Sequence, residues 1–251
     1  MGLWSMLLVL VAGFAAGAVN TIVGSGSLIT YPTMVMLGVP PVAANIANTV
    51  GLVPGSLAGA WGYHSELPSL DRPKLGWLAC ASAIGAMIGA FLLTRLPAAS
   101  FKIVVPFLIL IAALLVAFQP KIAARTGAMT GTRWRPLIVT VAVAGIYGGY
   151  FSAAQGVILL GLLGVFMASD IQQHNAIKNI LQAVVNLVAA IFFIASGHVV
   201  WLPVGLVAVG SILGALTGAA IGKRIPAHGL RIFVVIFGFA MAVFMAWQAL
   251  R

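Results

Sequence analysis

The feature that most constrains this chain is an uninterrupted run of 62 uncharged residues, 2–63. A helix of about 20 apolar residues crosses the ~30 Å hydrocarbon core of a membrane, so this run has room for about three membrane segments. Only 6% of the chain is charged and 62% is hydrophobic, against roughly 45–50% in soluble proteins. The sequence therefore predicts an all-α integral membrane protein and excludes a water-soluble globule.

The charged residues are strongly biased toward the basic types. Thirteen Lys and Arg oppose three acids, Glu66, Asp71 and Asp170, which gives a formal net charge of +10. In a membrane protein such an excess indicates orientation first, because cytoplasmic loops are rich in Lys and Arg. No basic patch alternates with aromatic residues, so we expect no nucleic-acid partner. The single cysteine, Cys80, has no metal-ligand spacing around it, and we expect neither a metal nor a cofactor.

Polar and glycine-rich interruptions divide the apolar sequence. The first break, residues 20–27 (NTIVGSGS), leaves only half a span at 28–37. The second interrupts the uncharged stretch 136–169 around Ser152, Gln155 and Gly156. The full-length membrane segments that we expect are 3–19, 42–63, 75–94, 103–119, 177–195, 201–222 and 232–250.

A polar break at membrane depth has two interpretations. Non-helical backbone in lipid leaves amide groups unsatisfied at several kcal/mol each, so it is tolerated only where it is buried in protein or lines a wet cavity. On that interpretation each break is a candidate site. The alternative is an ordinary turn at the membrane surface, with Gly and Asn chosen for turn geometry.

An internal repeat favours the first interpretation. Residues 85–102 (GAMIGAFLLTRLPAASFK) align without gaps to residues 214–231 (GALTGAAIGKRIPAHGLR). At nearly the same offset, of about 130, Gly13 and Gly17 pair with Gly145 and Gly149, and Asn45 pairs with Asn175. Interrupted segments at corresponding places of two halves are the best sequence indication of a transport site near the membrane midplane. We therefore predict two homologous repeats, 1–119 and 136–251, joined by a basic cytoplasmic linker, 120–135.

Loop charge indicates how the two halves are oriented. If each half has a broken or re-entrant helix pair plus three full helices, each crosses an odd number of times and the repeats have inverted topology. One side then carries loop 63–74, of zero net charge, and most basic loop residues, and the positive-inside rule places that side in the cytoplasm and both termini outside. The two sets are Lys121, Arg125, Arg133, Arg135, Lys223, Arg224 and Arg231 on one side, and Arg95, Lys102 and Arg251 on the other.

The segment Asp170 to Asn186 carries the most polar helical face. His174, Lys178, Gln182 and Asn186 are spaced by four residues and share one face of a helix. Ionisable residues in a membrane normally face the bundle interior or a wet cavity. The alternative is that Lys178 extends to the membrane surface along its apolar stem.

If Lys178 faces the interior, it needs a negative partner. Asp170 is eight residues away and suits a helix N-cap, and the membrane segments of the first half contain no acid. An anionic substrate is the natural counter-charge, and helix N-termini at the two breaks add backbone N–H groups. His174 is a candidate for proton coupling, with packing on a polar face as the alternative. The expected substrate-binding residues are Asn20, Gly24, Ser25, Gly26, Asn45, Asn48, Ser152, Gln155, Asn175, Lys178 and Asn179.

These residues resemble those of the sulfite exporter TauE/SafE family, also called the toluene sulfonate uptake permease family. The resemblance covers nearly the whole chain and is carried by residues 15–32 (AAGAVNTIVGSGSLITYP), 38–63 (GVPPVAANIANTVGLVPGSLAGAWGY), 147–160 (YGGYFSAAQGVILL) and 174–181 (HNAIKNIL). It implies a multi-pass carrier of the bacterial inner membrane, built from two homologous halves. It also implies a small sulfur-containing anion as substrate, such as sulfite, sulfoacetate or another sulfonate.

Three function classes follow from the sequence. The favoured one is a secondary transporter that works by alternating access. An anion channel is the alternative, although duplicated halves with interrupted segments favour a carrier. An intramembrane enzyme is disfavoured, because the chain has no HExxH, no GxSxG, no cysteine cluster and no intramembrane acid pair. Membrane lipid is an expected partner, and the sequence leaves a homodimer open.

Overall fold

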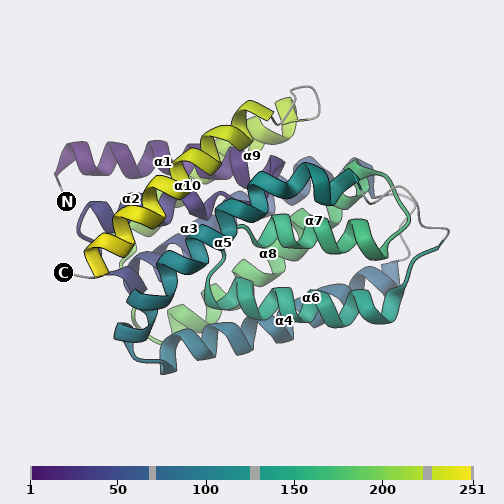
Figure 1. Cartoon of the computed structure of the whole chain (residues 1–251), viewed down its shortest axis with the longest axis horizontal. Helices are drawn as coiled ribbons and strands as arrows, with labels where there is room; N and C mark the ends of the chain where they lie inside the picture. Colours follow the sequence, from purple (N-terminus) through teal and green to yellow (C-terminus); the bar gives the residue numbers. More distant parts are fainter. Residues whose placement is uncertain (1, 68–71, 125–130, 223–227, 250–251) are drawn as a thin grey trace.

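The computed structural model describes residues 2–67, 72–124, 131–222 and 228–249. Within these ranges the chain forms α-helices joined by short connections and one 3₁₀ helix, and none of these residues lies in a strand. The elements, labelled as in Figure 1, are α1 (Leu3–Ile22), α2 (Ser27–Met36), α3 (Pro41–Gly62), η1 (His64–Glu66), α4 (Arg72–Arg95), α5 (Ala98–Ala124), α6 (Trp134–Tyr150), α7 (Gln155–Phe166), α8 (Ile171–Ala195), α9 (Trp201–Gly222) and α10 (His228–Ala249).

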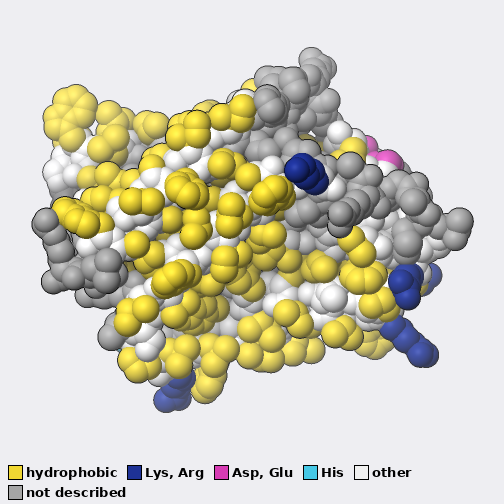
Figure 2. Space-filling view, in the orientation of Figure 1, with side chains coloured by type: hydrophobic (Ala, Val, Ile, Leu, Met, Phe, Trp, Pro, Cys, Tyr) yellow, Lys and Arg dark blue, Asp and Glu magenta, His cyan; other side chains and the backbone are white. Residues whose placement is uncertain are grey.

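The length and surface of the helices fit a membrane. Four described helices are long and apolar enough to cross one: α1, α4, α8 and the Trp201–Ile221 part of α9. Shorter apolar helices or parts of helices are Ile103–Phe118, Gln155–Phe166 and Ile232–Phe244. Hydrophobic side chains cover the middle of the face seen in Figure 2, and Lys and Arg side chains lie mainly toward its margins. The chain is a multi-pass integral membrane protein, as its sequence predicts.

Both expected helix breaks are confirmed. α1 ends at Ile22 and α2 begins at Ser27, so residues 23–26 form the first break. α6 ends at Tyr150 and α7 begins at Gln155, so residues 151–154 form the second. α2 has 10 residues and α7 has 12. At 1.5 Å per residue each is about half a membrane thick, and each break therefore lies within the bundle.

Helices of one half pack against helices of the other half, in matching pairs. α1 packs along α9, the fourth helix of the second half, and α6 packs along α4, the fourth helix of the first. In the same way α3 contacts α9 while α8 contacts α4, and α2 contacts α10 while α7 contacts α5. α3 packs on α8 and α5 on α10. Each of these contacts between helices with different positions in the two halves thus has a counterpart with the halves exchanged.

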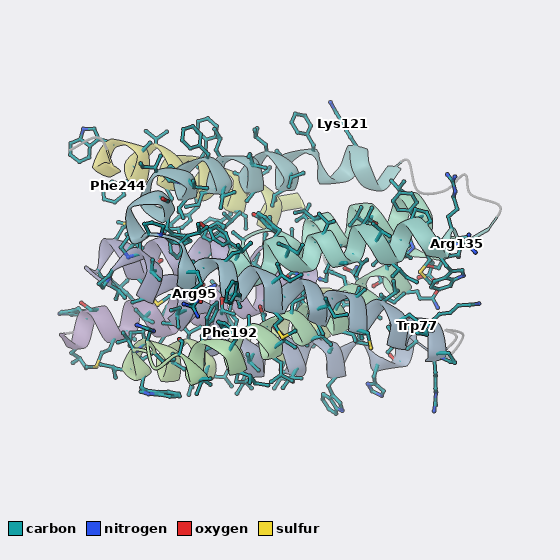
Figure 3. The ribbon with its side chains drawn as sticks, turned by 90° about the horizontal axis from the view of Figure 1, so that it is seen from below. Trp77, Arg95, Lys121, Arg135, Phe192 and Phe244 are labelled. Carbon is teal, nitrogen blue, oxygen red and sulfur yellow. The ribbon has the colours of Figure 1, made fainter. Side chains whose placement is uncertain are left out.

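The direction of the chain differs between corresponding helices. In Figure 1, α1 runs from the left end into the bundle, and α6 runs the opposite way, from the right. The start of α1 and the end of α10 lie at the same end. Seen from below in Figure 3, Arg135 lies toward one end of the bundle and Arg95 toward the other.

Glycines let the helices of these pairs approach each other closely. A Cβ on Gly85 of α4 would overlap the carbonyl oxygen of Ala142 in α6, and a Cβ on Gly214 of α9 would overlap that of Phe14 in α1. Gly85 and Gly214 are the first residues of the aligned repeat segments. The repeat read from the sequence thus coincides with matching backbone contacts in the fold.

The same contacts correct one pairing in the alignment. Gly17 lies against Ser211 of α9, and Gly145 lies against Ser82 of α4. Because Ser82 and Ser211 each lie three residues before the first residue of the aligned segments, Gly17 corresponds to Gly145, whereas the sequence pairs it with Gly149. The error is one helical turn. Small residues four apart share a helix face, so the sequence alone does not separate these two registers.

The expected linker, 120–135, is partly helical. α5 continues to Ala124 and α6 begins at Trp134. Residues 125–130, 223–227 and 250–251 lie outside the described residues, and with them Arg125, Lys223, Arg224 and Arg251.

Candidate substrate site at the crossing of the two helix breaks

The two helix breaks touch each other. The backbone N–H of Gly156, in the first turn of α7, donates a hydrogen bond of 3.0 Å to the carbonyl oxygen of Gly24. Gly24 has φ +86°, a conformation that residues with a Cβ rarely adopt. A Cβ on either glycine would overlap the backbone of the other. Both glycines are therefore required for the two interrupted segments to meet.

Lys178 of α8 lies at the end of α1. Its side chain is fully buried, with 0% exposure. The Nζ atom donates to the carbonyl oxygens of Asn20, at 3.0 Å, and Thr21, at 2.9 Å, in the last turn of α1. Asn179 Nδ2 also donates to the carbonyl of Thr21, at 3.4 Å. The ammonium group thus lies inside the bundle, and the alternative of an extension to the membrane surface is wrong.

Asn20 joins the first break to α8 through its side chain. Its Oδ1 accepts hydrogen bonds from Gln182 Nε2, at 3.1 Å, and from the backbone N–H of Gly26, at 3.4 Å. A Cβ on Gly26 would overlap the carbonyl of Ala16, so this turn is also packed tightly against α1. The backbone N–H groups of Gly26 and Gly156, expected to face an anion, are used within the protein.

A second polar cluster joins α2, α3 and the second break. Ser27 Oγ and Ser152 Oγ are hydrogen-bonded at 2.8 Å. Asn48 Nδ2 donates to Ser27 Oγ at 2.9 Å and to Ser152 Oγ at 3.3 Å, and Asn48 Oδ1 accepts from Thr30 Oγ1. One turn earlier on α3, Asn45 Nδ2 donates to the carbonyl of Tyr150 at 2.9 Å. Tyr150 is the last residue of α6.

The ends of α1 and α6 are therefore held in related ways. Each receives a side-chain donor from the third helix of the other half, α8 for α1 and α3 for α6. The donor differs in charge, because Lys178 is an ammonium and Asn45 is a neutral amide. The site thus has one cationic side and one neutral side.

Several buried polar atoms around the crossing have no hydrogen-bond partner among the described residues. Ser25 and Gln155 are both fully buried. The side chain of Gln155 occupies the space beside Gly148 of α6, where a Cβ would overlap it. Buried polar atoms in native proteins are normally satisfied, by protein, water or ligand. These unpartnered atoms are Ser25 Oγ, Gln155 Oε1, Gln155 Nε2, Asn45 Oδ1, Gln182 Oε1 and Asn186 Oδ1.

No carboxylate among the described residues forms an ion pair with Lys178, and the nearest acid in sequence has another role. Asp170 Oδ1 accepts from the backbone N–H groups of Gln172, at 2.8 Å, and Gln173, at 2.9 Å. This confirms Asp170 as the N-cap of α8. The C-terminus of a helix carries only about −0.5 elementary charge, so the end of α1 compensates the ammonium in part. The described residues leave the rest of the positive charge uncompensated.

Most of the predicted site residues come together at the crossing. Asn20, Gly24, Gly26, Asn45, Asn48, Ser152, Lys178 and Asn179 all belong to the hydrogen bonds described above. His174 is buried without a partner for either ring nitrogen among the described residues, and Asn175, half-buried, has an unpartnered Oδ1. Both lie near the start of α8, about one turn before Lys178. The described residues bring together no group of three or more His, Cys, Asp and Glu side chains that could hold a metal.

The sequence interpretation did not name Thr21, Ser27, Thr30 and Gln182 as site residues. Ser27 and Thr30 share one face of a ten-residue helix, and polar residues in so short an apolar segment are the signal that could have identified them. Gln182 belongs to the polar stripe of α8. Thr21 contributes a backbone carbonyl, which side-chain patterns do not reveal.

Comparison with known proteins identifies relatives that match nearly the whole chain. The chain is 26% identical over 239 residues to a probable membrane transporter protein of Haemophilus influenzae, covering 94% of this chain and 92% of the relative. It is 28% identical to the probable membrane transporter protein ORF9 of a Sinorhizobium species, with 93% and 89% covered. It is 24% identical to the probable membrane transporter protein YfcA of Escherichia coli, with 93% and 87% covered. No solved structure matches the chain.

The all-α membrane bundle, the buried polar crossing and these relatives define a membrane transporter. The model of the sulfite exporter TauE/SafE family matches residues 9–245. The chain belongs to this family.

Proposed function

We propose that this protein is a secondary transporter that moves a small sulfur-containing oxyanion across the bacterial inner membrane by alternating access. The observation that carries the proposal is Lys178. It is fully buried, its Nζ donates to two carbonyl oxygens at the end of α1, and no described carboxylate pairs with it. The family description, sulfite exporter, supports sulfite or a related sulfonate as the class of substrate.

Charge favours an anion over a neutral or cationic substrate. Removing a charge from water costs several kcal/mol unless it is paired. The two carbonyl contacts use two of the three N–H groups of Lys178, so one donor and roughly half of the charge remain for a ligand. Ser25 Oγ and Gln155 Nε2 are buried donors without partners among the described residues. We infer that they bind the oxygens of the anion next to Lys178.

The matching contacts between the two halves support alternating access. The halves form matching contacts, α1 with α9 and α6 with α4, and corresponding helices run in opposite directions. We infer that the halves are inverted-topology repeats. In such transporters the two repeats rock against each other around a fixed central site. The crossing at Gly24 and Gly156 lies where such motion changes access from one side to the other.

Two alternatives remain testable in the same assay. A channel gives flux that rises with concentration without saturation, and an enzyme converts the anion into a new compound. The experiment measures uptake of radiolabelled sulfite and of a labelled sulfonate into proteoliposomes that contain the purified chain. Saturable uptake of unchanged anion, absent from empty liposomes, supports the carrier. Non-saturating flux or chemical turnover overturns it.

A further inference from the structure

We propose that the neutral polar cluster at the end of α6 is a binding site for Na⁺, and that Na⁺ there favours binding of the anion at Lys178. The site consists of the Tyr150 carbonyl and the side-chain oxygens of Asn45, Asn48, Ser27, Ser152 and Thr30. The inference rests on the proposed transport function. It goes beyond that function, because it assigns a cation to residues that the sequence predicts to bind the anionic substrate.

The first argument is the asymmetry between the two halves. The repeat pairs Asn45 of α3 with Asn175 of α8, 130 residues apart, and Ser56 and Asn186, hydrogen-bonded at 2.8 Å, have the same separation. At the same separation, Asn48 is the counterpart of Lys178. In one half the end of the broken helix lies against the protein's own ammonium group. In the other half, the oxygen atoms of the cluster lie at the end of α6, and no described cationic side chain contacts them.

The second argument is an unsatisfied acceptor. Asn45 is 1% exposed, and its Oδ1 has no partner among the described residues although its Nδ2 donates to the carbonyl of Tyr150. An oxygen in this position accepts a hydrogen bond or binds a cation. The C-terminal end of α6 adds partial negative charge at the same place. Carbonyls at the ends of interrupted helices are the groups that bind Na⁺ in other transporter folds.

The third argument concerns which cation fits. Hard cations prefer oxygen ligands, and three hydroxyls, two amide oxygens and one carbonyl are available here. Divalent ions such as Ca²⁺ and Mg²⁺ are bound chiefly by carboxylates. The cluster contains none, so a single charge is the most that it supports. The amide of Asn48 must turn so that its Oδ1 faces the ion, which breaks its bond from Thr30.

Charge also links this site to Lys178. A cation among neutral ligands inside a membrane lacks a counter-charge, and the oxyanion beside Lys178 supplies one. Binding of each ion then strengthens binding of the other by the same factor, because coupling between sites is reciprocal. Lys178 donates to the carbonyls of Asn20 and Thr21, which are not part of this cluster, so the two sites have different ligands.

The test uses the purified full-length chain in two measurements. Melting temperature in detergent is compared in NaCl, KCl and choline chloride at equal ionic strength, with and without sulfite. Sulfite uptake into proteoliposomes is compared with the same three salts outside. We expect Na⁺ to raise the melting temperature and to increase the apparent affinity for sulfite about tenfold, with no such effect of choline or K⁺.

Asn48→Ala and Ser152→Ala should each lose the response to Na⁺ in both measurements. Ser82→Ala is the matched control, because Ser82 is a buried serine on α4 outside the site. Asn48→Lys brings a tethered ammonium to the cluster and should give a melting temperature that no longer depends on Na⁺. The Na⁺ site is overturned if Na⁺ has no effect on the wild-type protein, if K⁺ has an equal effect, or if the effect of Na⁺ persists in both alanine variants. The cluster would then bind ordinary water. Saturable sulfite uptake without any effect of Na⁺ refutes this site alone, whereas absence of uptake in every salt refutes the proposed transport function.

Discussion

The backbone N–H of Gly156 donates to the carbonyl oxygen of Gly24 over 3.0 Å, so the two interrupted segments are joined directly through their main chains. The contact links residues 132 positions apart and leaves no room for a Cβ on either one. It links the main chains of the two breaks at the proposed site, and it is open to mutation.

Gly156→Ala should destabilise the protein and impair transport. The added methyl group overlaps the backbone of Gly24 and contacts Gln182 Oε1, and such overpacking typically costs about 1–3 kcal/mol. The check is the melting temperature together with sulfite uptake. Gly205→Ala is the control, because a Cβ at Gly205 meets nothing within 4 Å. Equal behaviour of the two variants would mean that the breaks do not need to touch.

The contact between Ser56 and Asn186 should contribute a measurable coupling energy. Asn186 Nδ2 donates to Ser56 Oγ at 2.8 Å, deep between α3 and α8. Hydrogen bonds between membrane helices average about 0.6 kcal/mol in double-mutant cycles. A cycle of Ser56→Ala, Asn186→Ala and the double variant should give a coupling of that size in unfolding free energy. Strict additivity would show that the two side chains do not stabilise each other.

Several features of this site could be predicted from the sequence for one physical reason. Polar residues are expensive in a membrane, so Asn20, Lys178 and Gln155 in apolar segments indicate a buried site wherever the helices pack. The same cost explains why the ends of the broken helices could be located to within a few residues. The all-α membrane fold follows from the apolar composition alone.

The partners of those residues could not be predicted. That Lys178 meets the end of α1 depends on which helix packs beside α8, and neither the spacing nor the charge of the sequence encodes that choice. The register that the sequence predicts between α1 and α6 is wrong by one turn. Gly145 and Gly149 are both small residues on one helix face, and only their neighbours in the fold distinguish them. The roles of the break glycines also differ from expectation, since Gly24 and Gly156 pack against each other.

The orientation of the chain can be tested by a fusion. The basic residues Lys121, Arg133 and Arg135 belong to the side with the greater positive charge, which the positive-inside rule places in the cytoplasm. Both ends of the chain then face the periplasm. A reporter active only in the periplasm should be active when fused after Arg251. Activity of a cytoplasm-specific reporter at that position would reverse the assignment.

His174 offers a test of proton coupling. The side chain is 1% exposed and lies one turn before Lys178 on α8. If it carries a proton during transport, His174→Gln should abolish the stimulation of uptake by an imposed pH gradient while retaining exchange of labelled for unlabelled anion at equal pH on both sides. Unchanged stimulation in His174→Gln would assign the residue to packing.

The most direct test of the central claim is anion uptake by Lys178→Met in proteoliposomes, a substitution that keeps an unbranched side chain and removes the charge. Lys121→Met, which removes an exposed lysine at the far end of α5, is the control. We expect sulfite uptake to be lost in Lys178→Met and retained in the control, with both proteins extracted as folded, monodisperse material. Sulfite uptake at the wild-type rate in folded Lys178→Met would contradict the account, since the anion would then be bound without the buried ammonium group.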